Sequence, residues 1–427
     1  MLFDREKIGE KATLVFFSKN EKKDSENLEF SELVSSAGAD IVGGIFSQNR
    51  NPNARYFLGK GKLNELHASI RENNSDLIIF NASLTPSQER NIEQKLECRV
   101  LDRTGLILDI FAQRARSFEG KLQVELAQLH HISTRLIRGW THLERQKGGI
   151  GLRGPGETQL ETDRRLINNR IRQLKFRLNQ VEKRREMNRQ NRLKAGIPTV
   201  AIVGYTNAGK STLFNKLTGA KEFVRDQLFA TLDPVMRRLD LKEGGPIILS
   251  DTVGFIKELP HELVAAFKAT LQEAREADLI LHVVDASDKN RLQRVRQVNN
   301  VLRQLDADKV PQIRVYNKVD KLKFKTNQIR SGNRFLKSVW LSALTGQGLN
   351  TILSAISDFI SKNVILGCIE LTNKQGRQRA KLFQMGAVRE EKILNDGSWE
   401  LLLKIKKQDI QRFLKKEGIK TNAFVKM

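Results

Sequence analysis

The sequence predicts an α/β multidomain protein, and three observations support this prediction. Short apolar runs alternate with helical patterns near the start of the chain. A long helical region follows, and a glycine-rich stretch interrupts it once. Farther on, a strand–loop–helix unit carries a phosphate-binding motif. Because a domain usually has about 100–200 residues, a chain of 427 residues has room for a separate core in each region.

The first region, residues 1–112, is predicted to form an α/β subdomain. Its runs "TLVFF", "DIVGGIF", "DLIIF" and "RVLDR" have the composition of strands and alternate with helical patterns, which is typical of a small parallel sheet. Thr85 is expected to cap a helix that Pro86 opens. In "YFLGKGKLNEL", residues 59–62 have the composition of a phosphate-binding turn. Short glycine motifs are weak evidence, so we favour a basic turn before a helix.

The second region, residues 113–196, is predicted to form an antiparallel helical hairpin. Apolar residues recur at steps of three and four on both sides of the interruption, as two helices packed side by side require. They are Leu122, Leu126, Leu129, Leu136, Trp140 and Leu143 on the first side, and Ile167, Ile171, Leu174, Leu178 and Val181 on the second. Each arm of about 30 residues would extend roughly 45 Å. The stretch "KGGIGLRGPGETQLE" is then the tip of the hairpin.

The charge of the chain points to a polyanionic partner. With 74 Lys and Arg against 49 Asp and Glu, the formal net charge is +25, which exceeds what solubility requires. The second arm, Arg164 to Lys194, carries twelve Lys/Arg against two Glu. With so few acidic residues, most of these cations cannot form salt bridges along the helix. The alternative interpretation is that they form only a solvated helix face. We therefore interpret the hairpin as a basic lever for RNA.

The sequence also bears on the cellular compartment. No apolar run approaches the roughly 18 residues that a membrane span needs, so we expect no stable membrane insertion, while peripheral association with an anionic membrane would account for the same charge. The start of the chain shows no secretory signal. Cys98 and Cys368 are too few for a disulfide framework or a zinc site, and they fit a reducing cytoplasm. We expect a cytoplasmic monomer.

The phosphate-binding loop is not the glycine-rich tip, because such a loop needs a strand before it and a helix after it. The segment "TVAIVGYTNAGKSTLFNKL" meets both conditions, and its residues Gly204 to Ser211 match GxxxxGK[ST]. Lys210 is expected to reach the β- and γ-phosphates, and Ser211 to ligate magnesium. The residues predicted to bind the phosphates are Gly204, Tyr205, Thr206, Asn207, Ala208, Gly209, Lys210, Ser211 and Thr212.

Three further motifs follow predicted strands in the order of a GTPase domain. They are "DTVG" (251–254), "NKVD" (317–320) and "SAL" (342–344), and together they predict a P-loop GTPase domain over residues 197–362. Asp320 can accept hydrogen bonds from both the ring N–H and the exocyclic amine of guanine, which adenine does not present in that arrangement. The other residues expected around the base are Asn317, which supports it, Lys318, which stacks along it, and Ser342 with Ala343, which close the pocket.

Magnesium and the γ-phosphate are expected to meet three of these segments. Asp251 is placed to hold magnesium through water, and the Gly254 amide to touch the γ-phosphate. Thr231 in "FATLDP" is the expected switch threonine, whose hydroxyl closes on both groups. The predicted metal ligands are thus Ser211, Thr231 and Asp251, and the predicted catalytic residues are Lys210, Thr231 and Gly254.

The sequence resembles the HflX family of translational GTPases. The resemblance rests on "GGIGLRGPGETQLETDRR", "GYTNAGKSTLFNKL", "LFATLDP", "DTVGFI", "LVAAFKATLQE", "YFLGKGK" and "RTGLILDIFAQRA", and it covers the chain from about Ala12 to about Asp358. Residues 363–427 match less distinctively. Their pattern predicts a small α/β module with a turn at Asp396-Gly397 between two strands.

The resemblance implies a protein that binds the large ribosomal subunit in its GTP form, separates stalled or idle 70S ribosomes and takes part in stress recovery. It also implies GTP and GDP as substrate and product, Mg²⁺ as cofactor, and a glycine tip carried toward the peptidyl transferase region. The ribosome-contact candidates are Gly151, Arg153, Gly154, Pro155, Gly156, Arg164 and Arg165.

One residue departs from the wider GTPase pattern. Many small GTPases place a water-orienting glutamine directly after DxxG, where this chain, like HflX relatives, has Phe255. Hydrolysis by the isolated protein is therefore expected to be slow, with the orienting group supplied by the ribosome or by a rearranged switch.

The sequence leaves two other functional classes open. One is a GTPase of ribosomal subunit assembly or RNA modification. The other is a scaffold or membrane-linked regulator, which the hairpin disfavours because a membrane-surface helix shows one broad apolar face.

Overall fold

The structure is a computed structural model that describes residues 10–17, 24–48, 52–135, 159–194, 196–220, 228–229, 235–242, 245–256, 273–322, 338–419 and 424–426. The chain divides into two compact units. The first comprises residues 1–179, 225–233 and 257–268, and the second comprises residues 180–224, 234–256 and 269–427. The predicted α/β multidomain class is confirmed, and the bounds of the four predicted domains stay predictions.

The first unit contains a parallel sheet of order β2-β1-β3-β4. Its strands are β1 (Lys11–Phe17), β2 (Asp40–Ser47), β3 (Leu77–Phe80) and β4 (Arg99–Leu101). The helices between and after them are α1 (Asp24–Ser36), α2 (Lys60–Asn73), α3 (Pro86–Leu96) and α4 (Arg103–Arg114). All four residues of β3 are buried, as expected of a parallel strand covered on both faces. The predicted parallel sheet is confirmed.

Two helix starts in this unit show what local sequence signals decide. Thr85 and Gln88 form a capping box with Pro86 in the first turn, so the predicted start of α3 is confirmed. Helix α2 begins at Lys60 with Gly59 as its N-cap. Residues 60–62 therefore lie in the first turn of the helix and not in a basic turn before it.

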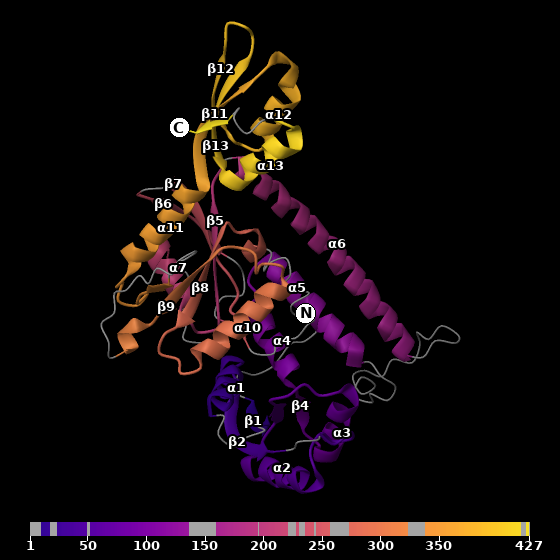
Figure 1. The fold of residues 1–427 in the computed structure, drawn as a ribbon. Coiled ribbons are helices and arrows are strands. Elements are labelled where there is room, and N and C mark those ends of the chain that lie inside the picture. Colours follow the sequence, from indigo (N-terminus) through magenta and orange to yellow (C-terminus); the bar gives the residue numbers. More distant parts are fainter. Residues whose placement is uncertain are drawn as a thin grey trace. The chain divides into compact units, whose positions relative to one another are not determined.

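The helical hairpin is formed by α5 (Phe118–Arg135) and α6 (Gln159–Lys194), which Figure 1 shows. Apolar side chains of the two helices pack together in one cluster, which consists of Leu122, Leu126, Leu129, Ile171 and Leu174, with Ile167 and Leu178 partly buried beside it. The predicted packing of two helices is thereby confirmed. Leu136, Trp140, Leu143 and the tip residues Gly151, Arg153, Gly154, Pro155 and Gly156 lie outside the described residues.

The second unit contains a six-stranded sheet of order β10-β9-β8-β5-β7-β6, in which only β6 runs antiparallel to its neighbour. Its strands are β5 (Thr199–Gly204), β6 (Val235–Leu241), β7 (Gly245–Asp251), β8 (Leu279–Asp285), β9 (Gln312–Asn317) and β10 (Ser338–Trp340). The accompanying helices are α7 (Lys210–Thr218), α10 (Arg291–Gln304), the short η1 (Val319–Lys321) and α11 (Leu349–Asn363). Because the motif loops follow β5, β7, β9 and β10, the sheet carries the predicted nucleotide site at the carboxyl ends of its parallel strands.

The last part of the same unit is an antiparallel sheet of order β12-β13-β11-β14. Its elements are β11 (Val364–Leu371), η2 (Asn373–Gln375), α12 (Gly376–Gln384), β12 (Val388–Ile393), β13 (Trp399–Lys406), α13 (Lys407–Glu417) and β14 (Phe424–Lys426). Between β12 and β13 the chain turns at Gly397, whose φ is +78°. The predicted small α/β module is confirmed.

Among the described residues, none of the helices combines the length and the apolarity that crossing a membrane requires.

Candidate nucleotide-binding site

The loop between β5 and α7 has the geometry that phosphate binding requires. Gly204 has φ +157° and Gly209 has φ +86°. A Cβ at Gly204 would lie less than 3.0 Å from the Val283 carbonyl oxygen, and one at Gly209 less than 3.0 Å from Asn317 Nδ2. Both positions therefore need glycine, for backbone conformation and for space. Thr206 Oγ1 is buried in this loop and has no hydrogen bond to any described residue.

Lys210 begins α7 and is 6% exposed. Its Nζ donates to the Tyr205 carbonyl oxygen at 2.8 Å, which holds the ammonium over the loop. The pKa of Lys210 is lowered to about 8, chiefly by burial; the negative charge of Asp251 opposes this effect, and the positive charge of Lys318 adds to it. A buried ammonium with little compensating charge suits an anionic ligand, which is the role predicted for this lysine.

The expected magnesium ligands that the structure describes lie together. Ser211 Oγ donates to Asp251 Oδ2 at 2.7 Å, so the start of α7 meets the end of β7. A hydroxyl and a carboxylate are hard oxygen donors, and they fit Mg²⁺, which when bound would neutralise charge on the phosphates. Thr231 lies outside the described residues. Within the described part of the chain, His, Cys, Asp and Glu form no group of three that could hold another metal.

The segment after β7 is tied to the phosphate loop. Phe255 N donates to the Gly204 carbonyl oxygen at 3.1 Å, and Thr206 N donates to the Phe255 carbonyl oxygen at 2.8 Å. Gly254 packs so closely that a Cβ would lie 2.9 Å from Lys210 Nζ. The Phe255 side chain is 2% exposed, so the residue in the position of the usual glutamine is a packed apolar group.

Asn317 links two loops of the site. Its Nδ2 donates to the Ala208 carbonyl oxygen at 2.9 Å, and its Oδ1 accepts from Ala343 N at 2.9 Å. Both ends of the amide are thus engaged by protein backbone. The geometry therefore assigns Asn317 the task of holding the phosphate loop and the "SAL" loop together, which is how it would support the base.

Asp320 is oriented by Ser342, whose Oγ donates to Asp320 Oδ1 at 2.5 Å. Lys318 has φ +64°, and its Nζ lies 2.9 Å from Asp285 Oδ2 and donates to Asn207 Oδ1 at 3.4 Å. Lys318 and Asp320 belong to the same "NKVD" segment, and these contacts place it beside the "SAL" loop and the phosphate loop. A base selected by Asp320 and covered by the Lys318 stem is consistent with this arrangement.

Sequence reasoning missed Asp285, which ends β8 and pairs with Lys318. Burial raises the pKa of Asp285, but hydrogen bonds from Ser287 and Lys318 outweigh that effect and the pKa is lowered. It therefore stays ionised and holds the lysine. The sequence did contain a signal for this residue, since Asp285 is a carboxylate at the carboxyl end of a parallel strand.

The structure gathers most of the predicted site residues at this edge of the sheet. Those that it describes are Gly204, Tyr205, Thr206, Asn207, Ala208, Gly209, Lys210, Ser211, Thr212, Asp251, Gly254, Asn317, Lys318, Asp320, Ser342 and Ala343.

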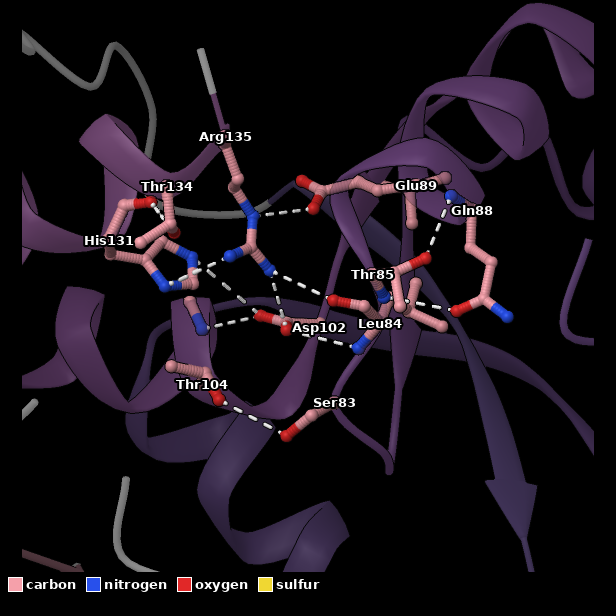
Figure 2. A network of polar contacts seen from close by, with 12 residues as sticks. Ser83, Leu84, Thr85, Gln88, Glu89, Asp102, Thr104, His131, Thr134 and Arg135 are labelled. Atoms are coloured by element: carbon pink, nitrogen blue, oxygen red, sulfur yellow. Dashed lines mark hydrogen bonds and ion pairs between the residues drawn. The ribbon is translucent and has the colours of Figure 1, made fainter. Parts of the chain in front are cut away.

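Sequence reasoning also missed a buried ion network in the first unit, which Figure 2 shows. Arg135 Nε donates to Glu89 Oε2 at 2.7 Å, and Arg135 Nη2 donates to Asp102 Oδ2 at 2.8 Å. Asp102 is 2% exposed and also caps α4, accepting from Gly105 N at 2.7 Å. His131 Nδ1 lies 3.2 Å from Arg135 Nη1. The network ties the last described turn of α5 to α3 and to the start of α4. The segment predicted to form the glycine tip follows α5 in the sequence.

Comparisons with known proteins agree with this geometry. Three family models match consecutive parts of the chain: GTP-binding GTPase N-terminal at residues 24–112, GTP-binding GTPase middle region at 114–192, and 50S ribosome-binding GTPase at 199–318. GTPase HflX of Escherichia coli strain K12 is 52% identical over 418 residues, which cover 97% of this chain and 98% of that protein. GTPase HflX of Magnetococcus marinus is 48% identical over 365 residues, which cover 84% and 83%.

Solved structures also match the chain. A GTP-binding protein from Sulfolobus solfataricus in complex with GDP has 23% sequence identity and a TM-score of 0.44, and the match covers 83% of this chain and 99% of that one. At this TM-score the likeness carries no argument about function.

Proposed function

Because the chain belongs to the HflX family of GTPases, we propose that it binds the large ribosomal subunit and dissociates stalled or idle 70S ribosomes, with GTP hydrolysis controlling its release. The P-loop domain and the family membership make the chain a GTP hydrolase. The matched model of a 50S ribosome-binding GTPase supports the choice of partner. Neither the described residues nor the comparisons support peripheral membrane association.

The observation that carries the proposal is the exposed basic surface of α6. One face of this helix packs on α5 through Ile171 and Leu174, while most of its cations lie in solvent. The exposed ones among the described side chains are Arg164, Arg165, Arg172, Lys175, Arg177, Lys183 and Arg184. So many like charges along one helix repel one another unless polyanionic phosphates approach, and ribosomal RNA supplies them.

The site residues account for GTP binding and for slow turnover. Lys210 and the backbone N–H groups of residues 204–211 would hold the β- and γ-phosphates, and Asp320 would select guanine. Bound Mg²⁺ would neutralise phosphate charge between Ser211 and Asp251. Since Phe255 is packed and apolar, it cannot orient the attacking water. The proposed orienting group therefore comes from the ribosome or from a rearranged switch.

Sedimentation of the protein with 70S ribosomes tests the proposal. With a non-hydrolysable GTP analogue, the protein should cosediment with large subunits, and light scattering should fall as 70S particles separate. Lys210→Ala should abolish tight GTP binding and splitting together. Turnover by the parent should be slow until large subunits are added. Rapid hydrolysis without any ribosomal component would contradict this account of Phe255, and binding only to precursor subunits would favour an assembly GTPase.

A deletion separates the tip from the arm. Removing residues 149–157 and bridging the helices with a short turn should leave nucleotide binding intact, because the described nucleotide-site residues belong to the second unit. Binding to the large subunit should survive in part, because the cations of α6 remain. Splitting should fall much further than binding. If the deletion variant splits 70S particles as well as the parent, the tip is only a connector.

A further inference from the structure

Phe176 is an exposed aromatic residue on the solvent side of α6. It is 65% exposed, although the helix buries Ile171 and Leu174 against α5. Those two residues lie five and two positions earlier, which at 100° per residue places Phe176 roughly opposite the packed face. A large aromatic side chain in that position adds nothing to the hairpin core, so the packing of α5 on α6 does not account for it.

The neighbours of Phe176 are basic or amide side chains. Lys175 and Arg177 flank it, and Arg172 lies one turn earlier on the same side of the helix. All three are exposed, and none of them forms an ion pair with any residue that the structure describes. Gln173 and Asn179, the adjacent residues on the remaining sides, are exposed amides. The aromatic ring therefore stands alone in a cationic, hydrogen-bonding surface.

This composition identifies the class of partner. A membrane-surface helix needs a broad apolar face, which the amides around Phe176 exclude. A protein interface core is depleted in charge, whereas this ring is surrounded by it. One aromatic ring among cations is the arrangement with which proteins hold single-stranded nucleic acid, because every base has a face on which an aromatic ring can stack.

We propose that the surface formed by Arg172, Lys175, Phe176 and Arg177 binds an unpaired nucleotide of ribosomal RNA, with Phe176 stacked on the base and the three cations on the neighbouring phosphates. The inference rests on the proposed function and deepens it, because it assigns one base-contacting side chain to the arm. It also divides binding into two separable parts. Stacking is insensitive to salt, whereas each phosphate contact releases counterions.

The test compares four variants by titrating isolated large subunits at several salt concentrations, with the GTP analogue bound. Phe176→Leu should weaken binding by about 5- to 150-fold, the range for losing one stacked base, without changing the slope of log K against log salt. Arg172→Gln should reduce that slope by roughly 0.7–0.9. Phe176→Trp should bind as the parent does, because it keeps the stacking ring. The matched control is Phe118→Leu, since Phe118 is 64% exposed but stands next to Glu119.

A second probe separates this inference from the proposed function. Fluorescence anisotropy with a labelled single-stranded RNA of about 20 nucleotides should show the same order of affinities for the four variants. One outcome contradicts the proposed function alone: the parent fails to bind large subunits, while its affinity for the single-stranded RNA still depends on Phe176. In that case the inference about the RNA-binding surface is supported. Equal affinity of Phe176→Leu and the parent for both probes overturns the inference. Equal losses in Phe176→Leu and Phe176→Trp also overturn it, because they indicate a shaped protein pocket for phenylalanine.

Discussion

His282 should make the stability of the second unit depend on pH below neutrality. It lies on β8 between Val203 of β5 and Arg314 of β9, and it is 1% exposed. Its Nδ1 has no hydrogen bond to any described residue. Burial lowers its pKa to about 4, and the charges of Arg314 and Lys210 act in the same direction. The folded protein therefore keeps this imidazole neutral where an unfolded chain would protonate it.

The magnitude follows from the two pKa values. A histidine in the unfolded chain titrates near 6.5, so the stabilising effect of the neutral form is complete above that pH and is lost as pH falls from 6.5 toward about 4. At 1.36 kcal/mol per pKa unit, the full loss is about 3 kcal/mol. At pH 5.5 the unfolded histidine is about ten-elevenths protonated while the folded one is nearly neutral, so the loss there is about 1.4 kcal/mol.

Urea unfolding at pH 7.5 and 5.5 measures this loss. Trp340 on β10 stacks on Tyr316, with the ring centroids 4.5 Å apart. When Trp140 and Trp399 are replaced by Phe, the fluorescence of Trp340 alone reports on the unfolding of the six-stranded sheet. The His282→Gln variant cannot titrate, and its loss between the two pH values should be smaller than that of the parent by about 1.4 kcal/mol. The reasoning is refuted if both proteins lose the same stability, or if NMR shows His282 titrating near pH 6.5 in the folded chain.

Three further substitutions have defined outcomes. Arg135→Gln should lower the free energy of unfolding by roughly 3–5 kcal/mol in calorimetry, because it leaves Glu89 and Asp102 buried without their cation; an unchanged melting temperature would contradict the network's role. Gly209→Ala should weaken GDP binding at least tenfold in equilibrium titration, because its φ is +86° and its Cβ would displace Asn317. The control is Gly219→Ala, which should bind GDP as the parent does: its φ is +67°, but an added Cβ would have no atom within 4 Å. Asp320→Asn should weaken GTP binding and improve xanthosine triphosphate binding in competition assays, and equal affinity of the parent for ATP and GTP would remove the basis of this pocket.

Local patterns determined most of the fold. The apolar run of β5, the glycines of the phosphate loop and the start of α7 at Lys210 are contiguous in sequence, and steric and hydrogen-bonding rules act on them directly. The capping box at Thr85 was predictable for the same reason. The hairpin followed from periodicity, because apolar residues at steps of three and four line the faces on which the two helices pack. The start of α2 was misplaced, since glycine and lysine at 59–62 are equally compatible with a turn and with a first helical turn.

The chain by itself determined which motifs are present, their order, and therefore the class of nucleotide that the pocket is built to bind. Tertiary structure decided how those motifs hold one another. Asn317 contacts a residue 109 positions earlier, Asp285 meets Lys318, and Arg135 joins carboxylates 33 and 46 positions away. Each of these polar groups is buried enough to need a hydrogen-bond or ion-pair partner. The sequence alone does not show which of several carboxylates or carbonyls that partner is. The partner is selected only when the packed sheet and helices fix which groups lie within hydrogen-bonding distance.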